Sequence, residues 1–252
     1  MNDSSKAILE VSDLRKSFGA VEALRGANLV CRAGEVTALV GDNGAGKSTL
    51  IRCITGVHPA SGGSIRFKGN EVAFNAPIEA RHLGIETVYQ DLALIEDLTV
   101  WQNMYLNREI THGWGPLRWL DRRDMIAQTE AKLGRLLVNM PPVRAKVRRL
   151  SGGQRQSISI GRAASWGSAL VIMDEPTAAL GLRERGAVET LIGNLRGEGI
   201  AQLVISHDLE QVMRISDSVW VMRGGQTIAH WRTNEVDRTQ IVAAIAGGDR
   251  IT

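Results

Sequence analysis

Gly41-Asp42-Asn43-Gly44-Ala45-Gly46-Lys47-Ser48 fits the pattern G-x-x-x-x-G-K-[ST] and follows a β-rich apolar run, Val36–Val40. In this pattern the glycines let backbone N–H groups converge on phosphate oxygens, and the following helix adds the partial positive charge of its N-terminus. Lys47 then reaches the β and γ phosphates of a nucleotide, Ser48 ligates Mg²⁺, and Thr49 lies beside the α phosphate. The stretch predicts a strand, a phosphate-binding loop and a helix, whereas the alternative is a plain Gly-rich turn.

Two carboxylates follow a second apolar run. Leu170–Met173 is typical of a buried strand, and Asp174 and Glu175 end it before Pro176. Burying two carboxylates is costly unless a cation compensates them, and a phosphate-bound Mg²⁺ supplies one. Asp174 is therefore a candidate metal ligand, and Glu175 a candidate base for the attacking water. The alternative is that Asp-Glu-Pro simply ends a strand and begins a turn.

A histidine ends the next predicted strand. Gln202–Ile205 precedes Ser206 and His207, and a helix from about Arg183 to Arg196 separates this strand from the previous one. A strand, helix, strand order implies parallel pairing, so His207 is expected at the same sheet edge as the carboxylates, where it could contact a γ phosphate. A structural histidine is the alternative.

The remaining pattern predicts three further parts of one folding unit. Short β-rich runs at 8–11 and 21–30, and a strand at 64–67 between turn signals, favour a small antiparallel sheet beside the main one. Ile85–Tyr89 returns to strand. From about Leu98 to Ala164 the apolar residues follow helical periodicity, with Leu133, Leu136 and Leu137 on one face, which predicts a helical subdomain.

Composition excludes several classes of protein. The 252 residues are 44% hydrophobic and 23% charged, and 30 Lys plus Arg against 27 Asp plus Glu leave a formal charge of +3, too small for a nucleic-acid binder. No apolar run approaches the roughly 18 residues of a membrane span, and residues 1–10 lack a signal-peptide pattern. Cys31 and Cys53 have no disulfide or metal spacing, so a reducing cytoplasm is expected.

The segment Leu150-Ser151-Gly152-Gly153-Gln154-Arg155-Gln156 completes the set of motifs. With the phosphate loop before it and Asp174-Glu175 after it, the chain resembles ATP-binding-cassette ATPases over essentially its full length. The resemblance implies an α/β fold of the P-loop NTPase class: a RecA-like parallel sheet core, a small antiparallel β subdomain and an inserted α-helical subdomain. It implies one domain, 1–252, with the core and β subdomain at about 1–90 and 165–252 and the helical part at about 91–164.

The resemblance also implies site roles, with ATP and Mg²⁺ as ligands. Phe18 matches the aromatic that stacks on adenine, although core packing is its alternative role. Gln90 matches a glutamine that senses the metal and γ phosphate, and His207 matches the switch histidine. Two cassettes face head to tail, so that each ATP lies between the phosphate loop of one and Ser151, Gly152, Gly153 and Gln154 of the other. The catalytic candidates are Lys47, Gln90, Glu175 and His207, and the metal candidates are Ser48, Gln90 and Asp174.

One departure from the family pattern points to a subgroup. Where the family has Ser-Ala-Leu-Asp, this chain has Ala178-Ala179-Leu180-Gly181, so no carboxylate stands at Gly181. This variant and the Trp-bearing stretch Gly113–Leu120 are similar to importers of ribose, xylose and fructose. A soluble cassette acting on ribosomes or DNA, and a cassette for a non-sugar solute, remain alternatives.

Importer ATPases of this kind imply a set of partners and a location. The partners are a second ATPase subunit, expected to be a second copy, transmembrane permease subunits, and indirectly an extracytoplasmic solute-binding protein, with no nucleic acid. The implied location is peripheral, on the cytoplasmic face of the cell membrane. The apolar stretch from Gln90 to Leu106 is the expected docking surface for the permease.

Overall fold

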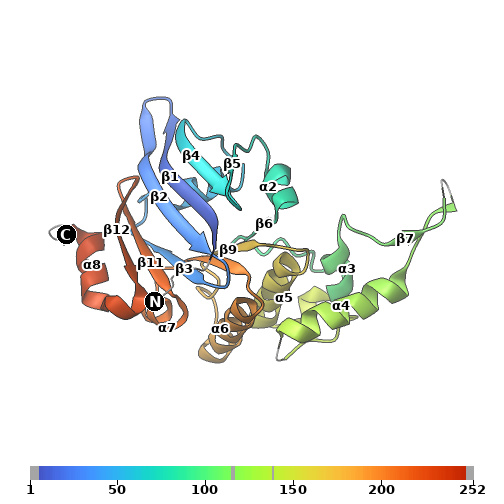
Figure 1. The fold of residues 1–252 in the computed structure, drawn as a ribbon. Helices are drawn as coiled ribbons and strands as arrows, with labels where there is room; N and C mark the ends of the chain where they lie inside the picture. Colours follow the sequence, from blue (N-terminus) through green and yellow to red (C-terminus); the bar gives the residue numbers. More distant parts are fainter. Residues whose placement is uncertain (1–5, 115–116, 138, 248–252) are drawn as a thin grey trace.

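The computed structural model describes residues 6–114, 117–137 and 139–247. The first residues of the N-terminal stretch and two positions of the Trp-bearing stretch, 115–116, lie outside the described residues. Figure 1 shows a sheet-rich body and a helical part that extends away from it. None of the helices in the described part of the chain has the length and apolar character needed to span a bilayer.

A six-stranded sheet lies at the centre of the described residues. Its order is β12 (Gln226–Arg232), β11 (Ser218–Arg223), β3 (Val36–Val40), β10 (Ala201–Ile205), β9 (Leu170–Asp174) and β6 (Ile85–Val88). Neighbouring strands from β11 to β6 run parallel, and β12 pairs antiparallel with β11. The parallel pairing of β9 and β10 confirms the predicted strand, helix, strand unit. Because parallel strands end at the same sheet edge, the loops after β3, β9 and β10 meet there.

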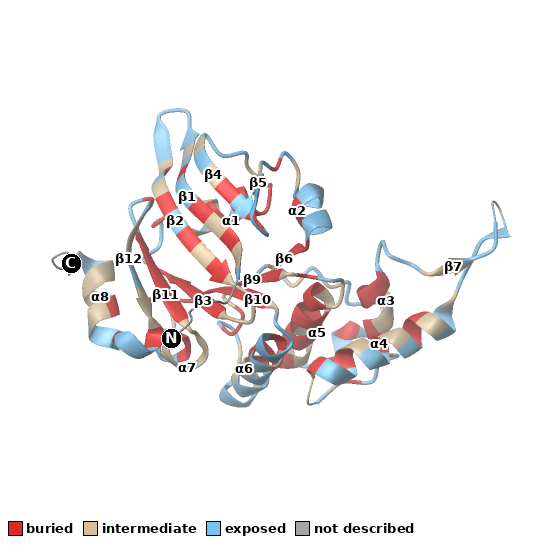
Figure 2. Ribbon diagram, in the orientation of Figure 1, coloured by how far each residue is buried: buried red, intermediate tan, exposed pale blue. Residues whose placement is uncertain are grey.

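The two faces of this sheet carry two hydrophobic cores. Along β9 the residues alternate, so that Leu170 and Ile172 join one cluster and Val171 and Met173 join the other. The first cluster includes α1 (Lys47–Ile54). The second includes apolar residues of α5 (Gly152–Ala164) and α6 (Leu182–Gly197). Both faces of the sheet are covered at β3, β9 and β10, so these strands are almost wholly buried (Figure 2). A strand buried on both faces needs apolar residues at nearly every position, which explains their continuous apolar sequences.

A four-stranded antiparallel sheet completes the first core and confirms the predicted β subdomain. Its order is β2 (Val21–Arg32), β1 (Ala7–Phe18), β4 (Gly62–Phe67) and β5 (Asn70–Val72), and α2 (Pro77–Leu83) follows it. β1 is longer than the predicted 8–11 run, because pairing with β2 continues to Phe18. Gly63 belongs to β4 and is not a turn residue as predicted; a Cβ there would lie 2.3 Å from the Asp13 carbonyl oxygen.

The region predicted as helical contains helices and one strand pair. The helical elements are α3 (Val100–Tyr105), α4 (Arg122–Leu136), the 3-10 turn η2 (Val147–Arg149) and α5. Leu133 and Leu136 of α4 are buried, whereas Leu137 lies just past its end. Between α3 and α4, β7 (Thr111–His112) pairs with β8 (Trp119–Leu120), which the helical pattern did not predict. This arm projects at the right of Figure 1 and leaves Trp114 92% exposed.

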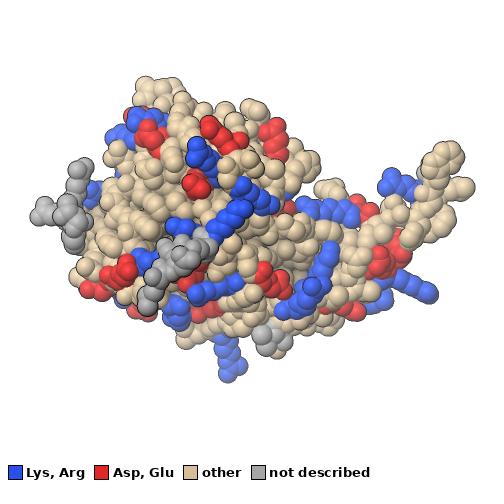
Figure 3. Space-filling model, in the orientation of Figure 1, with Lys and Arg blue, Asp and Glu red and all other residues tan. Residues whose placement is uncertain are grey.

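The C-terminal elements close the other end of the sheet. They are α7 (Leu209–Ile215), the 3-10 turn η3 (Thr233–Glu235) and α8 (Arg238–Ala246). Val212 of α7 and Ile241 of α8 pack with Val219 and Val221 of β11 in a cluster of their own. On the face drawn in Figure 3, basic and acidic side chains are interspersed over the surface.

Candidate functional site

The phosphate loop connects β3 to α1 and needs glycine at particular positions. Gly41 has φ +149°, and a Cβ there would lie 2.2 Å from the carbonyl oxygen of Met222. Gly46 has φ +102°, in the left-handed region that favours glycine, and its Cβ would lie 3.0 Å from the Ala23 carbonyl oxygen. The backbone can therefore turn tightly at the N-terminus of α1, where N–H groups are free to bind phosphate.

Lys47 folds back over this loop. Its Nζ donates hydrogen bonds to the carbonyl oxygens of Gly41 at 2.6 Å and Asp42 at 2.9 Å. Partial burial lowers the pKa of Lys47, while the nearby charges of Glu175, Asp42 and Asp174 act in the opposite direction. When a nucleotide binds, the Lys47 ammonium can replace these two carbonyl oxygens with phosphate oxygens, which form stronger, charge-assisted hydrogen bonds.

A cavity of about 390 Å³ joins the loop to the ends of β9 and β10. Of the predicted site residues it is lined by Asn43, Gly44, Ala45, Gly46, Lys47, Ser48, Thr49, Asp174 and Glu175. Arg25 and the turn Gly224–Gly225 also line it, and sequence reasoning missed them. The Gly-Gly pair was the one available signal, since it marks the turn between β11 and β12.

Asp174 and Ser48 form the part of this cavity that suits Mg²⁺. Burial raises the pKa of Asp174, and the neighbouring Glu175 charge raises it further, against the opposing effect of Lys47. A cation beside Asp174 would therefore be stabilising. The described residues hold no group of three or more His, Cys, Asp or Glu side chains able to bind a metal. Mg²⁺ is usually bound by one or two protein groups together with the phosphates of a substrate. The Asp174 carboxylate and the Ser48 hydroxyl fit that pattern.

Glu175 and His207 meet at the edge of the same sheet. Glu175 has φ +50°, an uncommon left-handed conformation for a residue with a side chain, and its N–H donates to the Ile205 carbonyl oxygen at 2.9 Å. Its Oε1 lies 3.0 Å from Nδ1 of His207. The predicted base and the predicted switch histidine are thus in direct contact.

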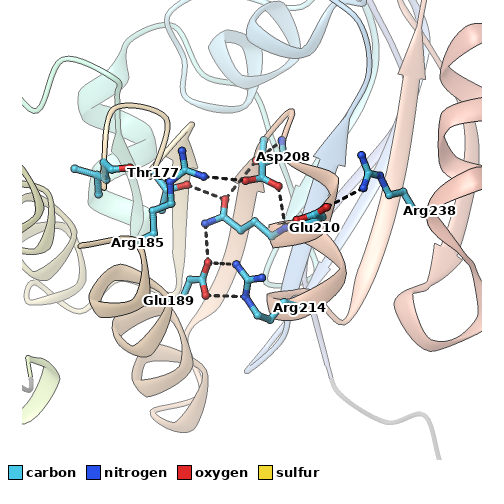
Figure 4. A network of polar contacts seen from close by, with 10 residues as sticks. Thr177, Arg185, Glu189, Asp208, Glu210, Arg214 and Arg238 are labelled. Carbon is cyan, nitrogen blue, oxygen red and sulfur yellow. Dashed lines mark hydrogen bonds and ion pairs between the residues drawn. The ribbon is translucent and has the colours of Figure 1, made fainter. Parts of the chain in front are cut away.

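A polar network holds the two segments that follow these residues (Figure 4). Thr177 donates to Gln211 Oε1 at 2.9 Å, and Gln211 Nε2 donates to Glu189, which also forms an ion pair with Arg214. Arg185 Nη1 donates to Asp208 Oδ2 at 3.2 Å. The network ties α6 to α7 and so limits the movement of Glu175 and His207. The sequence showed no signal for it.

Gln90 and Phe18, two of the predicted residues that do not line this cavity, lie on other parts of the surface. Gln90 follows β6 at the sheet edge where Asp174 ends β9, but its side chain is exposed and does not line the cavity. Phe18, at the end of β1, is 45% exposed and contacts the ring of His58 edge-on, with ring centroids 5.1 Å apart. Lys16 Nζ lies over the same ring, 4.9 Å from its centroid, and the stacking role of Phe18 stays a prediction.

Ser151, Gly152, Gly153 and Gln154, the signature segment, open α5. Ser151 is the N-cap: its Oγ accepts from the Gln154 N–H at 3.3 Å, and Gln154 Oε1 accepts from the Ser151 N–H at 3.0 Å. Ser151, Gly153 and Gln154 line a second cavity of about 550 Å³, together with residues of α6. This cavity shares no lining residue with the first.

A third cavity, of about 270 Å³, lies beside the predicted docking stretch. Leu92 and Leu106 line it, with Arg108, Arg162 and Trp166. Val100 is wholly buried and so is unavailable to a partner, whereas Leu94 is partly buried against the helical core.

Comparisons with known proteins agree with this geometry. A family model described as ABC transporter matches residues 24–178. The xylose/arabinose import ATP-binding protein XylG of Sulfolobus acidocaldarius is 42% identical over 244 residues, covering 96% of each chain. The fructose import ATP-binding protein FrcA of Rhizobium meliloti is 40% identical, covering 97% of this chain and 95% of FrcA. A crystal structure of an ATP-binding cassette of an ABC transporter, in its ADP conformation, superposes with TM-score 0.80 at 29% identity, covering 97% of both chains.

Proposed function

This chain belongs to the ABC transporter family, and we propose that it is the ATP-hydrolysing subunit that powers the import of a monosaccharide. The observation that carries the proposal is the cavity that gathers Lys47, Ser48, Asp174 and Glu175 around the phosphate loop. The sugar class is supported by XylG and FrcA, whose names state xylose/arabinose and fructose import.

Each of the predicted catalytic and metal-binding residues has a proposed role. Lys47 and the loop N–H groups bind the β and γ phosphates, and Glu175 orients the attacking water and accepts its proton. His207, in contact with Glu175 at 3.0 Å, holds that carboxylate in place and reaches for the γ phosphate. Ser48 and Asp174 would hold Mg²⁺, with Gln90 as a further ligand, and the ion would neutralise developing phosphate charge.

A complete site requires two chains. The signature segment lines a cavity that shares no residue with the phosphate-loop cavity, which supports a site completed by a second chain. We therefore propose a head-to-tail pair, with a second copy of this chain as the expected partner. Each ATP would lie between the loop of one copy and Ser151–Gln154 of the other, at the N-terminus of α5.

The helical part, residues 91–164, is the proposed link to the membrane. The third cavity, between β6, α3 and α5, suits a short permease helix, with Leu92 and Leu106 as apolar contacts and Arg162 at its side. Gln90 connects this cavity to the sheet edge. The subunit would then sit at the cytoplasmic face of the membrane, with a solute-binding protein on the other side.

The decisive experiment is transport by the assembled complex. The subunit is reconstituted in liposomes with its permease and solute-binding protein, and ATP-dependent uptake of labelled xylose, arabinose, ribose, fructose and galactose is measured. We expect uptake of at least one of these sugars, and none with Glu175→Gln. ATP hydrolysis without uptake of any monosaccharide would contradict the sugar assignment while leaving the ATPase assignment intact.

The docking site has its own test. Leu106→Asp places a charge in the third cavity, whereas Val242→Asp, a matched control, places one on the exposed surface of α8. We expect Leu106→Asp to abolish uptake while the free subunit still hydrolyses ATP. Normal uptake by Leu106→Asp in an intact complex would contradict docking at this cavity.

A further inference from the structure

Glu184, in the first turn of α6, reaches the N-terminus of α5. Its Oε1 accepts from the Gly153 N–H at 3.2 Å. Oε2 accepts from the Gly181 N–H at 3.4 Å. The Ser151 side chain and the backbone N–H groups of Gly153 and Gly181, in that order, lower the pKa of Glu184, so it is a carboxylate at neutral pH.

The side chain of Glu184 also fills the space over the signature segment. A Cβ built on Gly153 would lie 2.7 Å from Glu184 Cβ and 2.9 Å from its Cγ. The Ser151 oxygen accepts from the Gln154 N–H at 3.3 Å, so its one proton remains available to an acceptor. The anion-binding end of α5 is thus occupied by a carboxylate from the same chain.

A backbone N–H and a hydroxyl each carry a single proton, so neither donor serves two anions at full strength. Under the function proposed above, on which this inference rests, Ser151 and Gly153 must donate to the γ phosphate held by the partner. We propose that Glu184 is a competing anion that occupies the signature donors in the free subunit and must be displaced before two subunits close on ATP. The second cavity, lined by Arg183, Gly186 and Ala187, is beside it and has room for the displaced side chain.

The test is ATP-driven dimerisation, measured by sedimentation velocity in a Glu175→Gln background that prevents turnover. Glu184→Gln and Glu184→Ala are compared with the parent and with Glu198→Gln, which removes a carboxylate from the exposed far end of the same helix. We expect both Glu184 variants to lower the ATP concentration for half-maximal dimerisation at least about fivefold. Glu198→Gln should match the parent.

A second readout separates competition from a structural role. Binding of fluorescent ATP to the monomer should be unchanged, because Glu184 does not line the phosphate-loop cavity. Glu184→Ala could lower the melting temperature because it loses the hydrogen bond from the Gly181 N–H. Glu184→Gln then distinguishes competition from a structural effect, since its amide oxygen can still accept that hydrogen bond. Dimerisation of Glu184→Gln within twofold of the parent, or weaker, would overturn the proposal. A parent that never dimerises with ATP would instead overturn the shared site itself.

Discussion

Glu175 occupies a backbone conformation that few residues other than glycine adopt. Its φ of +50° turns the chain directly after Asp174, and a hydrogen bond from its N–H to Ile205 holds the turn. Both carboxylates line the cavity that Ser48 also lines, and Glu175 Oε1 lies 3.0 Å from Nδ1 of His207 as well. The identity of Glu175 was readable from the sequence, but its geometry was not, because no local pattern signals a left-handed glutamate.

Replacing Glu175 with Gln should stop turnover without preventing binding. The amide keeps the shape and loses the base, and loss of a general base typically lowers a rate 10²–10⁴-fold, so we expect at least about 100-fold slower phosphate release. ATP affinity, measured with a fluorescent analogue, should stay within about threefold of the parent. Glu130→Gln, an exposed carboxylate on α4, is the control. Unchanged phosphate release would remove Glu175 from its proposed role.

Lys47→Ala should act on binding itself. In the free subunit the ammonium is held by two loop carbonyls, and phosphate oxygens would replace them with stronger, charge-assisted hydrogen bonds. We expect ATP affinity to fall about tenfold or more, since one such contact is worth at least 1.4 kcal/mol. Lys146→Ala, with an exposed side chain, is the control. Equal affinity of Lys47→Ala and the parent would argue against a phosphate contact.

Some residues of the cavity could not be predicted from the sequence, because contacts between distant segments of the chain place them there. Asp174, Glu175 and His207 were located by their position at the ends of apolar strands. Arg25 reaches the cavity because its N–H donates to the Gly225 carbonyl oxygen at 2.8 Å, joining segments 200 positions apart. No periodicity or motif indicates such a contact. The sequence therefore predicts the carboxylates of the cavity but not the residues, such as Arg25, that reach it from distant segments.

At the scale of elements, helices α4 and α5 are in contact where the large side chain of Leu133 packs against Gly161. Leu133 is wholly buried, and a Cβ at Gly161 would lie 2.6 Å from its Cδ2. Gly161 therefore sits in a helix, where glycine is unfavourable by about 1 kcal/mol, because the neighbouring leucine leaves no room for a methyl group. The contact sets how closely the signature helix approaches α4.

A double-mutant cycle tests this contact. We expect Leu133→Ala to lower the free energy of unfolding by about 2–4 kcal/mol through the cavity that it leaves. Gly161→Ala alone should be neutral or destabilising. In the Leu133→Ala background the same methyl group enters vacated space, so Gly161→Ala should restore about 1 kcal/mol. The measurement is denaturant unfolding of all four proteins, and additive effects would mean that the two side chains do not compete for volume.

The elements themselves were predicted where one signal dominated. β3, β9 and β10 carry continuous apolar runs because both faces are covered, and those runs were recognised. β1 continues through Arg15, Lys16 and Ser17, polar residues held in the strand by pairing with β2, and pairing with a distant segment cannot be read locally. The β7–β8 arm was missed for the opposite reason: its Trp and Leu residues look like a core but are exposed.

At the scale of the whole molecule, the phosphate loop and the signature segment, the two half-sites of the proposed composite site, line different cavities. The phosphate loop and the signature segment line cavities that have no residue in common, so in the proposed pair each chain would contribute two incomplete halves. Two copies related by a two-fold axis would join them into two equivalent sites, because such symmetry makes each contact occur twice. A single-chain sequence motif could not define this arrangement; it was expected from the family resemblance alone.

Mixed dimers test the arrangement. Ser151→Arg blocks one half-site and Lys47→Ala the other, so a dimer of one of each contains one intact and one doubly altered site. We expect each variant alone to lack ATP-driven hydrolysis and their mixture to recover part of it. Crosslinks between cysteines placed at Ser151 and Ala45 of opposite chains would identify the mixed dimer. Crosslinking without recovered activity would show that both sites must be intact, and no crosslink would contradict the shared site.

The separation of the two cavities also has a genetic consequence. In the proposed pair each copy would lend half of its chemistry to its neighbour, so a dimer of one normal and one Glu175→Gln chain would keep one intact composite site. In a cell that makes equal amounts of normal and Glu175→Gln chains, random pairing leaves about a quarter of the dimers wholly normal. With about half of the dimers mixed, sugar uptake should stay near half if the two sites work independently. Uptake of about one quarter, the share of wholly normal dimers, would show that both sites of a dimer must be intact.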